Sequence, residues 1–188
     1  MSFSISPASG YYIDCPADQS ETKKIIETLK PVFEDESKNW VGHNLKYDML
    51  VLKWYGIDIK GKIFDTMLAH YVIDPEGKKS MDVLSARYLG YDPVHIEQLI
   101  GKKGKTQGNM RDVELADAKE YAVEDADITL QLKNIFVPKI KQYGVEKVFE
   151  QVENPLVKVL TGMEFEGIRI DEKFLNDYSF QLEGEAKK

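Results

Sequence analysis

Two aspartates and a tyrosine are the residues of this sequence whose types and spacing best suit a chemical reaction. Tyr121 and Asp125 lie one helical turn apart in a segment, 114–136, whose apolar residues recur at helical spacing, and Asp48 lies in a second such segment, 45–55. In both segments the aspartate falls among the apolar residues, so a helix that buries this stripe carries one carboxylate inward with it. Ionised carboxylates are seldom buried unless they are paired or bound to a metal. Because Mg²⁺ and Mn²⁺ prefer carboxylate oxygens, Asp48 and Asp125 are candidate metal ligands.

The chemistry open to such a group is phosphodiester hydrolysis. Two divalent ions about 4 Å apart can activate a water and stabilise the leaving oxygen. Tyr121, on the same side of its helix as Asp125, would orient the attacking water or help to deprotonate it. Each feature alone also fits a structural role, since an inward aspartate can cap a neighbouring strand or pair with Lys or Arg. A Tyr-x-x-x-Asp spacing also arises by chance in many helices, so the residues alone leave both interpretations open.

The elements that must position these residues alternate along the chain. Short strands are expected at 3–6, 11–13, 39–42, 63–64 and 168–170, and helices at 20–33, 45–55, 66–73, 80–90, 114–136, 145–167 and after 171. This order predicts an α/β fold with a mixed sheet flanked by helices. The side chain of Asn44 is expected to cap the helix that follows it. Aspartates near strand-to-helix junctions suit a site at the carboxyl edge of the sheet.

Composition restricts the class of protein. The 188 residues support one ordinary domain with a small appendage, and no apolar run approaches the roughly 18 residues of a membrane span. The N-terminus has no signal-peptide pattern, and the single Cys15 fits a reducing cytosol. We therefore expect a cytoplasmic protein without a membrane partner. A net charge of -7 argues against broad binding to duplex nucleic acid, although a small pocket for one strand end is compatible with it.

Several segments, taken together, resemble the proofreading 3′–5′ exonuclease domain of the bacterial DNA polymerase I family, which belongs to the ribonuclease H-like exonucleases. They are His43–Asp48, Phe64–Leu68, Ser80–Leu89 and Tyr121–Leu130, and the stretches Glu153–Leu160 and Gly167–Asp171 resemble the start of the polymerase region. The resemblance implies an exonuclease domain at 1–143 and the start of the polymerase region at 144–188. It also implies two-metal removal of 3′-terminal nucleotides from single-stranded DNA by a bacterial, nucleoid-associated protein.

The resemblance assigns roles to individual residues. Asp48 and Asp125 are implied to bind Mg²⁺ or Mn²⁺, and Tyr121 to position the nucleophilic water. Further positions are implied to hold the terminal nucleotides: Asn44, Lys46, Tyr47, the basic Lys78, and Ile96 in place of an aromatic residue that packs on a base. For Lys46 and Lys78 a solvated surface charge is an equally good interpretation.

Half of the family's carboxylates have no counterpart in this sequence. In the family, two further metal-binding carboxylates come from an Asp-x-Glu motif on the first strand. Three segments of this sequence resemble that motif, but 112–114 fits a helix start, 74–76 fits a turn and 65–67 fits a helix cap. The sequence therefore resembles an internal fragment that lacks the first, central strand of a ribonuclease H-like sheet. Two ligands in place of four predict weak metal binding and negligible catalysis. We expect the gap to close by direct pairing of the remaining strands, or through a second copy of the chain.

Three other functions are weighed against the proofreading exonuclease. A vestigial, non-catalytic exonuclease-like domain that supports the polymerase is disfavoured by the retention of Asp48, Tyr121 and Asp125. An RNA-trimming exonuclease of the same superfamily is disfavoured by the polymerase-like stretch 153–171. An ordinary binding domain with two structural aspartates is the least specific alternative.

Overall fold

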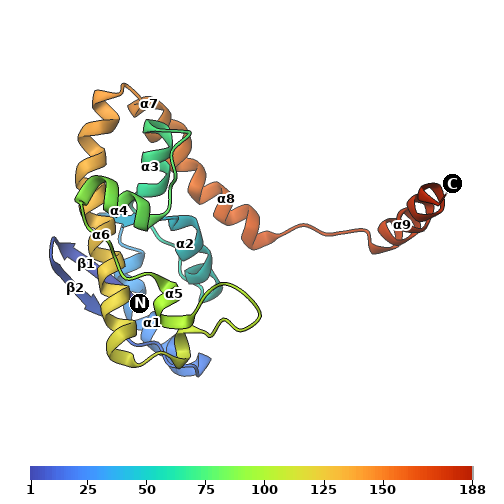
Figure 1. Ribbon diagram of the computed structural model, residues 1–188, viewed down its shortest axis with the longest axis horizontal. Helices are drawn as coiled ribbons and strands as arrows, with labels where there is room; N and C mark the ends of the chain where they lie inside the picture. Colours follow the sequence, from blue (N-terminus) through green and yellow to red (C-terminus); the bar gives the residue numbers. More distant parts are fainter. Residues whose placement is uncertain (188) are drawn as a thin grey trace.

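The computed structural model describes residues 1–187, which form an α/β fold made mostly of helices (Figure 1). Its elements in chain order are β1 (Ser2–Ser6), β2 (Ser9–Tyr12), α1 (Gln19–Phe33), β3 (Asn39–Gly42), α2 (Leu45–Trp54), β4 (Lys62–Asp65), α3 (Thr66–Ile73), α4 (Met81–Leu89), α5 (Ile96–Ile100), the 3-10 turn η1 (Met110–Asp112), α6 (Leu115–Gln142), α7 (Glu146–Val148), the π-helical η2 (Phe149–Glu153), α8 (Asn154–Glu166) and α9 (Glu172–Ala186). No helix among these residues is long and apolar enough to span a membrane.

The strands form two separate pairs. β1 and β2 make an antiparallel hairpin, with Phe3 opposite Tyr11, whereas β3 and β4 pair in parallel, with Trp40 opposite Ile63. No strand pairing joins the two sheets within residues 1–187. The expected single mixed sheet, and its closure by direct pairing of the remaining strands, are therefore wrong.

The hairpin is held by α6 instead of by a neighbouring strand. The backbone N–H of Ala8 in the hairpin turn donates to the Asp127 carboxylate at 2.8 Å. A Cβ added at Gly10 would lie 2.5 Å from a methyl carbon of Val123, so the missing side chain allows β2 to approach the helix. This docking fixes the hairpin on α6 and away from β3.

Two hydrophobic clusters form the core. The first joins α1, α2, the segment before β4, β4 itself and α8; its buried members are Ile26, Phe33, Leu45, Met49, Leu52, Ile57, Ile59, Ile63 and Val157. The second joins α3, α4, α6 and η2; its buried members are Ala69, Leu84, Ile128, Leu132, Phe136, Ile140 and Phe149. α2, which carries Asp48, belongs to the first cluster, and α6, which carries Asp125, belongs to the second.

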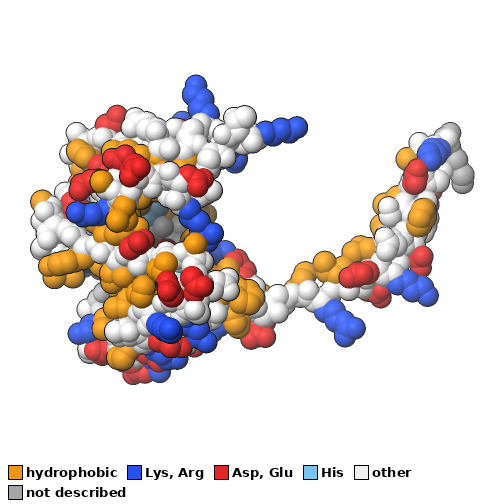
Figure 2. All heavy atoms as spheres, turned by 90° about the horizontal axis from the view of Figure 1, so that it is seen from below, with side chains coloured by type: hydrophobic (Ala, Val, Ile, Leu, Met, Phe, Trp, Pro, Cys, Tyr) orange, Lys and Arg blue, Asp and Glu red, His pale blue; other side chains and the backbone are white. Residues whose placement is uncertain are grey.

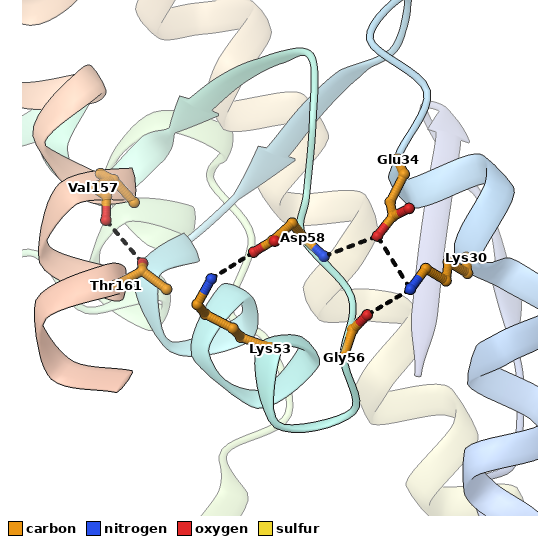
Figure 3. A network of polar contacts seen from close by, with 7 residues as sticks. All are labelled: Lys30, Glu34, Lys53, Gly56, Asp58, Val157 and Thr161. Carbon is orange, nitrogen blue, oxygen red and sulfur yellow. Dashed lines mark hydrogen bonds and ion pairs between the residues drawn. The ribbon is translucent and has the colours of Figure 1, made fainter. Parts of the chain in front are cut away.

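Polar contacts fix the position of α2 relative to α1. Lys30 of α1 donates to the carbonyl of Gly56 at 2.8 Å, and Lys53 of α2 forms an ion pair with Asp58 at 2.7 Å (Figure 3). The backbone N–H of Asp58 in turn donates to Glu34 at 3.4 Å. These contacts join the C-terminal ends of both helices to the loop that follows α2.

The C-terminal part differs from the rest of the fold. α8 packs against α2, and an extended segment then leads to α9, which projects from the body (Figures 1 and 2). The strand expected at 168–170 is absent from the described residues, since this segment is extended without a pairing strand, and Ile168 is 89% exposed. α6 also continues through Pro138 to Gln142, past the expected end at 136.

Candidate functional site

A cavity of about 1800 Å³ lies between the two hydrophobic clusters and contains both predicted metal ligands in its wall. Asp48 borders it from α2 and Asp125 from α6. β1, β3 and β4 contribute further parts of the wall. The two carboxylates therefore border one cavity, despite their separation in sequence.

Asp48 lies on the cavity wall and not in the core. It follows the buried Leu45 by less than one turn and precedes the buried Met49, yet Asp48 itself is exposed. The protein around the cavity nevertheless displaces much of its bulk hydration. This desolvation, with a smaller contribution from the Asp65 charge, raises the pKa of Asp48 to about 6.

Asp125 and Tyr121 form a pair on α6. Asp125 is half-buried, and desolvation raises its pKa to about 6, although a hydrogen bond from the Tyr121 hydroxyl acts in the opposite direction. The charges of Glu124 and Asp82 add smaller upward shifts. Burial and the neighbouring Asp125 raise the pKa of Tyr121 to about 12, so its hydroxyl remains protonated at neutral pH and acts as a donor.

The buried stripe of α6 matches the predicted one in part. Ala118, Thr129, Leu132 and Phe136 are buried as expected, whereas Leu115 is 55% exposed. Ala122 and Asp125 are half-buried. The carboxylate therefore sits at the border of the packed face, where a cavity reaches it.

Asp65 performs the capping role that was expected of Asn44. Asn44 does occupy the N-cap of α2, but in a left-handed conformation (φ 64°), and its side chain makes no capping bond. The Asp65 carboxylate, at the end of β4, accepts instead from the backbone N–H groups of Leu45 at 2.7 Å and Met67 at 2.9 Å. The Asp65 carboxylate therefore caps both α2 and α3. This shared cap fixes the position of the first turn of α2, the helix that carries Asp48.

The residues expected to contact DNA are spread over several surfaces. Tyr47 is 64% exposed and borders the cavity beside Asp48. Lys46 forms an ion pair with Glu164 of α8, which links α2 to the C-terminal part of the chain. Lys78 lies exposed in the loop before α4, and Ile96 lies exposed at the start of α5. Neither of these two residues borders the cavity.

Two acidic residues near Asp125 were missed in the sequence. Glu124 accepts from the Tyr91 hydroxyl and, at 2.9 Å, from the backbone N–H of Val94, so it fastens the loop before α5 to α6. Asp82 is paired with His95 at 3.1 Å. Glu124 is next to Asp125 in the sequence, but the position of Asp82 near Asp125 depends on the docking of α4 against α6, which no local pattern could have indicated.

The structure does not gather a larger set of ligands. Within residues 1–187 no group of three or more His, Cys, Asp or Glu side chains is arranged to hold a metal ion. His43, close to the site in sequence, has both ring nitrogens engaged at 2.9 Å, one by Thr66 and the other by the carbonyl of Lys79. What remains is a pair of desolvated carboxylates and one tyrosine donor in an α/β domain.

Comparison with known proteins places this α/β domain in a family. Residues 1–141 match a family model described as 3′-5′ exonuclease. The chain is 39% identical to DNA polymerase I of Rhizobium leguminosarum over 166 residues, which is 88% of this chain and 16% of that protein. It is 36% identical to DNA polymerase I of Borreliella burgdorferi over 178 residues, which is 93% of this chain and 19% of that protein.

A solved structure supports the same fold. The POL domain of Pol1 from M. smegmatis, in complex with DNA primer-template and dNTP, superposes with a TM-score of 0.70 at 21% identity, covering 95% of this chain and 28% of that one. The chain belongs to the 3′-5′ exonuclease family found in DNA polymerase I. It spans less than a fifth of the length of the two curated relatives named above.

Proposed function

We propose that this chain is the proofreading exonuclease part of a DNA polymerase I, which removes 3′-terminal nucleotides from single-stranded DNA in the bacterial cytoplasm at the nucleoid. The observation that carries the proposal is the pair Asp48 and Asp125, which border one cavity and both have a pKa raised to about 6. We assign the domain a ribonuclease H-like ancestry, with 1–143 as the exonuclease part and 144–188 as the start of the polymerase region.

The donor set of the site fits Mg²⁺ or Mn²⁺. Both ions take oxygen ligands, and carboxylates that lack a protein cation gain most from such an ion. Neither Asp48 nor Asp125 has a Lys or Arg partner among the ion pairs of the described residues. When bound, the ions would activate a water and stabilise the leaving oxygen of the phosphodiester.

The protein's own residues have separable tasks. Asp48 and Asp125 would hold the ions, and Tyr121, whose hydroxyl proton is donated to Asp125, would orient the water by accepting a hydrogen bond at its oxygen. Tyr47 and Asn44, next to Asp48, would hold the terminal nucleotide, and Lys46, Lys78 and Ile96 would contact the strand farther out. With two carboxylates as the ligands supplied here, we expect ion affinity to be weak and hydrolysis by this polypeptide alone to be negligible.

Manganese titration tests the metal site. We expect Mn²⁺, followed by EPR of the free ion and by the melting temperature, to bind weakly to the wild-type chain. Asp125→Asn should lower the affinity by at least about 10-fold, since even residues that only support a ligand change metal affinity by about 10–100-fold. Asp117→Asn, on the exposed side of the same helix, is the matched control and should leave the affinity unchanged. Equal binding by the wild type and Asp125→Asn would refute the site.

Digestion assays test the activity and the alternatives. A 3′-labelled DNA oligonucleotide with Mn²⁺ should remain largely intact with this chain, and rapid digestion would overturn the expectation of low activity. A DNA polymerase I of full length that carries this domain should digest the oligonucleotide. If it binds no Mn²⁺ and digests nothing, the domain is a non-catalytic support for the polymerase. Faster digestion of an RNA oligonucleotide would favour the RNA-trimming alternative.

A further inference from the structure

His70 of α3 is a buried imidazole without a hydrogen-bond partner. The residue is 0% exposed, yet neither of its ring nitrogens forms a hydrogen bond within residues 1–187. A neutral imidazole has one nitrogen that donates and one that accepts, so both capacities are unmet. The ring packs instead against aromatic side chains, with ring centroids 5.7 Å from Tyr88 and 5.8 Å from Phe136. Buried polar groups nearly always have partners, so this exception asks for an explanation.

A short length of chain covers the imidazole. Residues 75–78, in the connection between α3 and α4, form what we call the strap (Figure 1). A Cβ added at Gly77 would lie 2.8 Å from Cε1 of His70 and 2.7 Å from a carboxylate oxygen of Asp74. Because residue 77 has no side chain, the backbone can approach the ring this closely. The other three strap residues, Pro75, Glu76 and Lys78, are exposed, so the strap separates His70 from water.

Both ends of the strap are anchored. The residue before it, Asp74, donates its backbone N–H to the carbonyl of His70 at 2.8 Å and forms an ion pair with Arg87 of α4 at 2.7 Å. The hydrogen bond from Arg87 holds the pKa of Asp74 below its ordinary value, so this ion pair persists at pH 5. The residue after the strap, Lys79, accepts at its carbonyl from Nε2 of His43 at 2.9 Å.

The anchor at Lys79 does not depend on the charge of His43. A carbonyl oxygen only accepts, so Nε2 of His43 donates to it whether the ring is neutral or protonated. The other nitrogen, Nδ1, lies 2.9 Å from the Thr66 hydroxyl, which donates to a neutral ring and accepts from a charged one. With a charged ring the hydroxyl donates to the carbonyl of Gly42, at 3.1 Å. The bond to Lys79 therefore remains as pH falls.

Between its anchors the strap has little to hold it except its packing on His70. In the part of the chain that the structure describes, its backbone takes part in one hydrogen bond, from the N–H of Gly77 to the carbonyl of Asp74 at 3.1 Å. A segment with so few backbone hydrogen bonds can open locally while the rest of the fold stays intact.

The surroundings of His70 oppose a positive charge on the ring. Burial lowers the pKa of His70; the charge of Asp74 opposes this shift, and Arg87, Lys79 and His43 lower the pKa further. On the side of α6, Lys139 lies over the ring of Tyr88 at 5.4 Å and adds another positive charge. The one acid of this group, Asp74, is engaged by Arg87, so a proton on His70 has no free acceptor beneath the closed strap.

We propose that the strap is a pH-dependent lid, which lies closed over the neutral ring of His70 and opens when that ring is protonated. Opening lets the imidazolium reach water, and the anchors at Asp74 and Lys79 confine the movement to 75–78. Because an exposed histidine has a pKa of about 6.5, the open population can rise by at most about 30-fold at pH 5, the limit in which the closed form excludes the proton. Lys78 moves with the strap, but the proposal does not depend on the nuclease chemistry.

Hydrogen exchange of the full 188-residue chain tests the proposal. Exchange is followed by mass spectrometry at pH 7.5 and pH 5.0 and corrected for the intrinsic pH dependence of amide exchange. We expect the protection of the amides of 76–78 to be at least about fivefold lower at pH 5.0, whereas the amides of 128–136 in α6, the internal reference, should change less than about twofold. Nitrogen-15 NMR should show the His70 ring becoming charged over the same range. Strap protection that is equal at both pH values would overturn the proposal, whatever the charge of the ring.

Two variants of His residues separate His70 from other titrating groups. His70→Leu keeps an apolar side chain against the aromatic rings and cannot take up a proton, so its strap protection should be the same at both pH values. His95→Gln, which removes a histidine paired with Asp82 of α4, is the matched control and should keep the wild-type fall. Circular dichroism shows whether each variant is folded, and the wild-type exchange stands without them. An equal fall in His70→Leu would overturn the role of His70.

A substitution in the strap tests the geometry without any change of pH. Gly77→Ala places a methyl group against His70 and Asp74, so it should open the strap at pH 7.5 and lower its protection there at least about fivefold. Glu76→Ala, at an exposed position of the same strap, is the control and should stay within about twofold of the wild type. Unchanged protection in Gly77→Ala would contradict a strap that closes on His70.

Discussion

Two kinds of aspartate lie around the start of α2 and the cavity beside it, and they differ in the donors that reach them. Asp65 is 1% exposed, and its carboxylate accepts from four backbone N–H groups, those of Asn44, Leu45, Met67 and Leu68. Asp48 and Asp125 are more accessible, yet burial among protein atoms raises the pKa of each to about 6. The number of donors, together with accessible area, therefore distinguishes the structural Asp65 from the two carboxylates that are free to accept a cation.

Removal of the Asp65 carboxylate should give the largest change in the free energy of unfolding. Asp65→Ala leaves the first N–H groups of α2 and α3 without acceptors in a buried place, and we expect the free energy of unfolding to fall by at least about 3 kcal/mol. Urea denaturation followed by circular dichroism measures this loss. Asp177→Ala, on the exposed face of α9, is the control and should stay within about 0.5 kcal/mol of the wild type. A loss below about 1 kcal/mol for Asp65→Ala would show that these bonds contribute little.

Substitution of the cavity aspartates should raise the free energy of unfolding at pH 7, whereas substitution of Asp65 should lower it. Because the folded-state pKa of each is raised from 3.8 to about 6, the folded protein binds protons more tightly than the unfolded chain, and stability increases as pH falls from about 6 towards 4. The double variant Asp48→Asn/Asp125→Asn should therefore be more stable than the wild type at pH 7, by on the order of 1 kcal/mol after allowance for solvent screening. At pH 4 the two proteins should be nearly equal.

Histidines also titrate in this range and must be separated from the aspartates. Burial lowers the pKa of His43 and His70, so both remove stability as pH falls through 6.5. Both residues are present in the wild type and in the double variant, so the difference between the two unfolding curves isolates the aspartates. If the wild type and the double variant differ in their free energy of unfolding by the same amount at pH 7 and at pH 4, the raised pKa values are contradicted.

The contrast between these aspartates also shows what local sequence can predict. The spacing of apolar residues predicted β3 at 39–42 and the helix from Leu45, and it singled out Asp48 and Asp125 as polar residues on apolar faces. Helix periodicity is a local property, so it can be read within a window of a few turns. Residue identity at 65–66 also indicated a helix cap, which the structure confirms.

Long-range contacts account for what the sequence did not predict. Asp65 reaches across from β4 to cap α2, twenty residues earlier, and displaces Asn44 from that role. The hairpin docks on α6 through Asp127, 119 residues away from Ala8, instead of pairing with β3. Which strand edges meet depends on such docking, and apolar patterns within each strand carry no information about it.

The smallest change, in DNA affinity and in stability, is expected when the ion pair between Lys46 and Glu164 is removed. In the proposed function Lys46 contacts the DNA backbone, but its ammonium group is engaged by the Glu164 carboxylate of α8. Glu164→Gln removes a competitor for this lysine and one negative charge, so affinity for a single-stranded oligothymidylate should rise about two- to threefold at low salt. Exposed ion pairs contribute about 0–1 kcal/mol, so stability should change little.

Anisotropy of a labelled oligonucleotide at two salt concentrations measures the change, because a phosphate contact weakens as salt increases. The double variant Lys46→Gln/Glu164→Gln is the matched control. If Lys46 contacts phosphate, Glu164→Gln should bind DNA more tightly than this double variant. The difference in DNA affinity between the two variants should then become smaller at high salt. If both variants gain affinity equally, the effect is only the loss of a negative charge on α8, and Lys46 is a structural link between α2 and the C-terminal part of the chain.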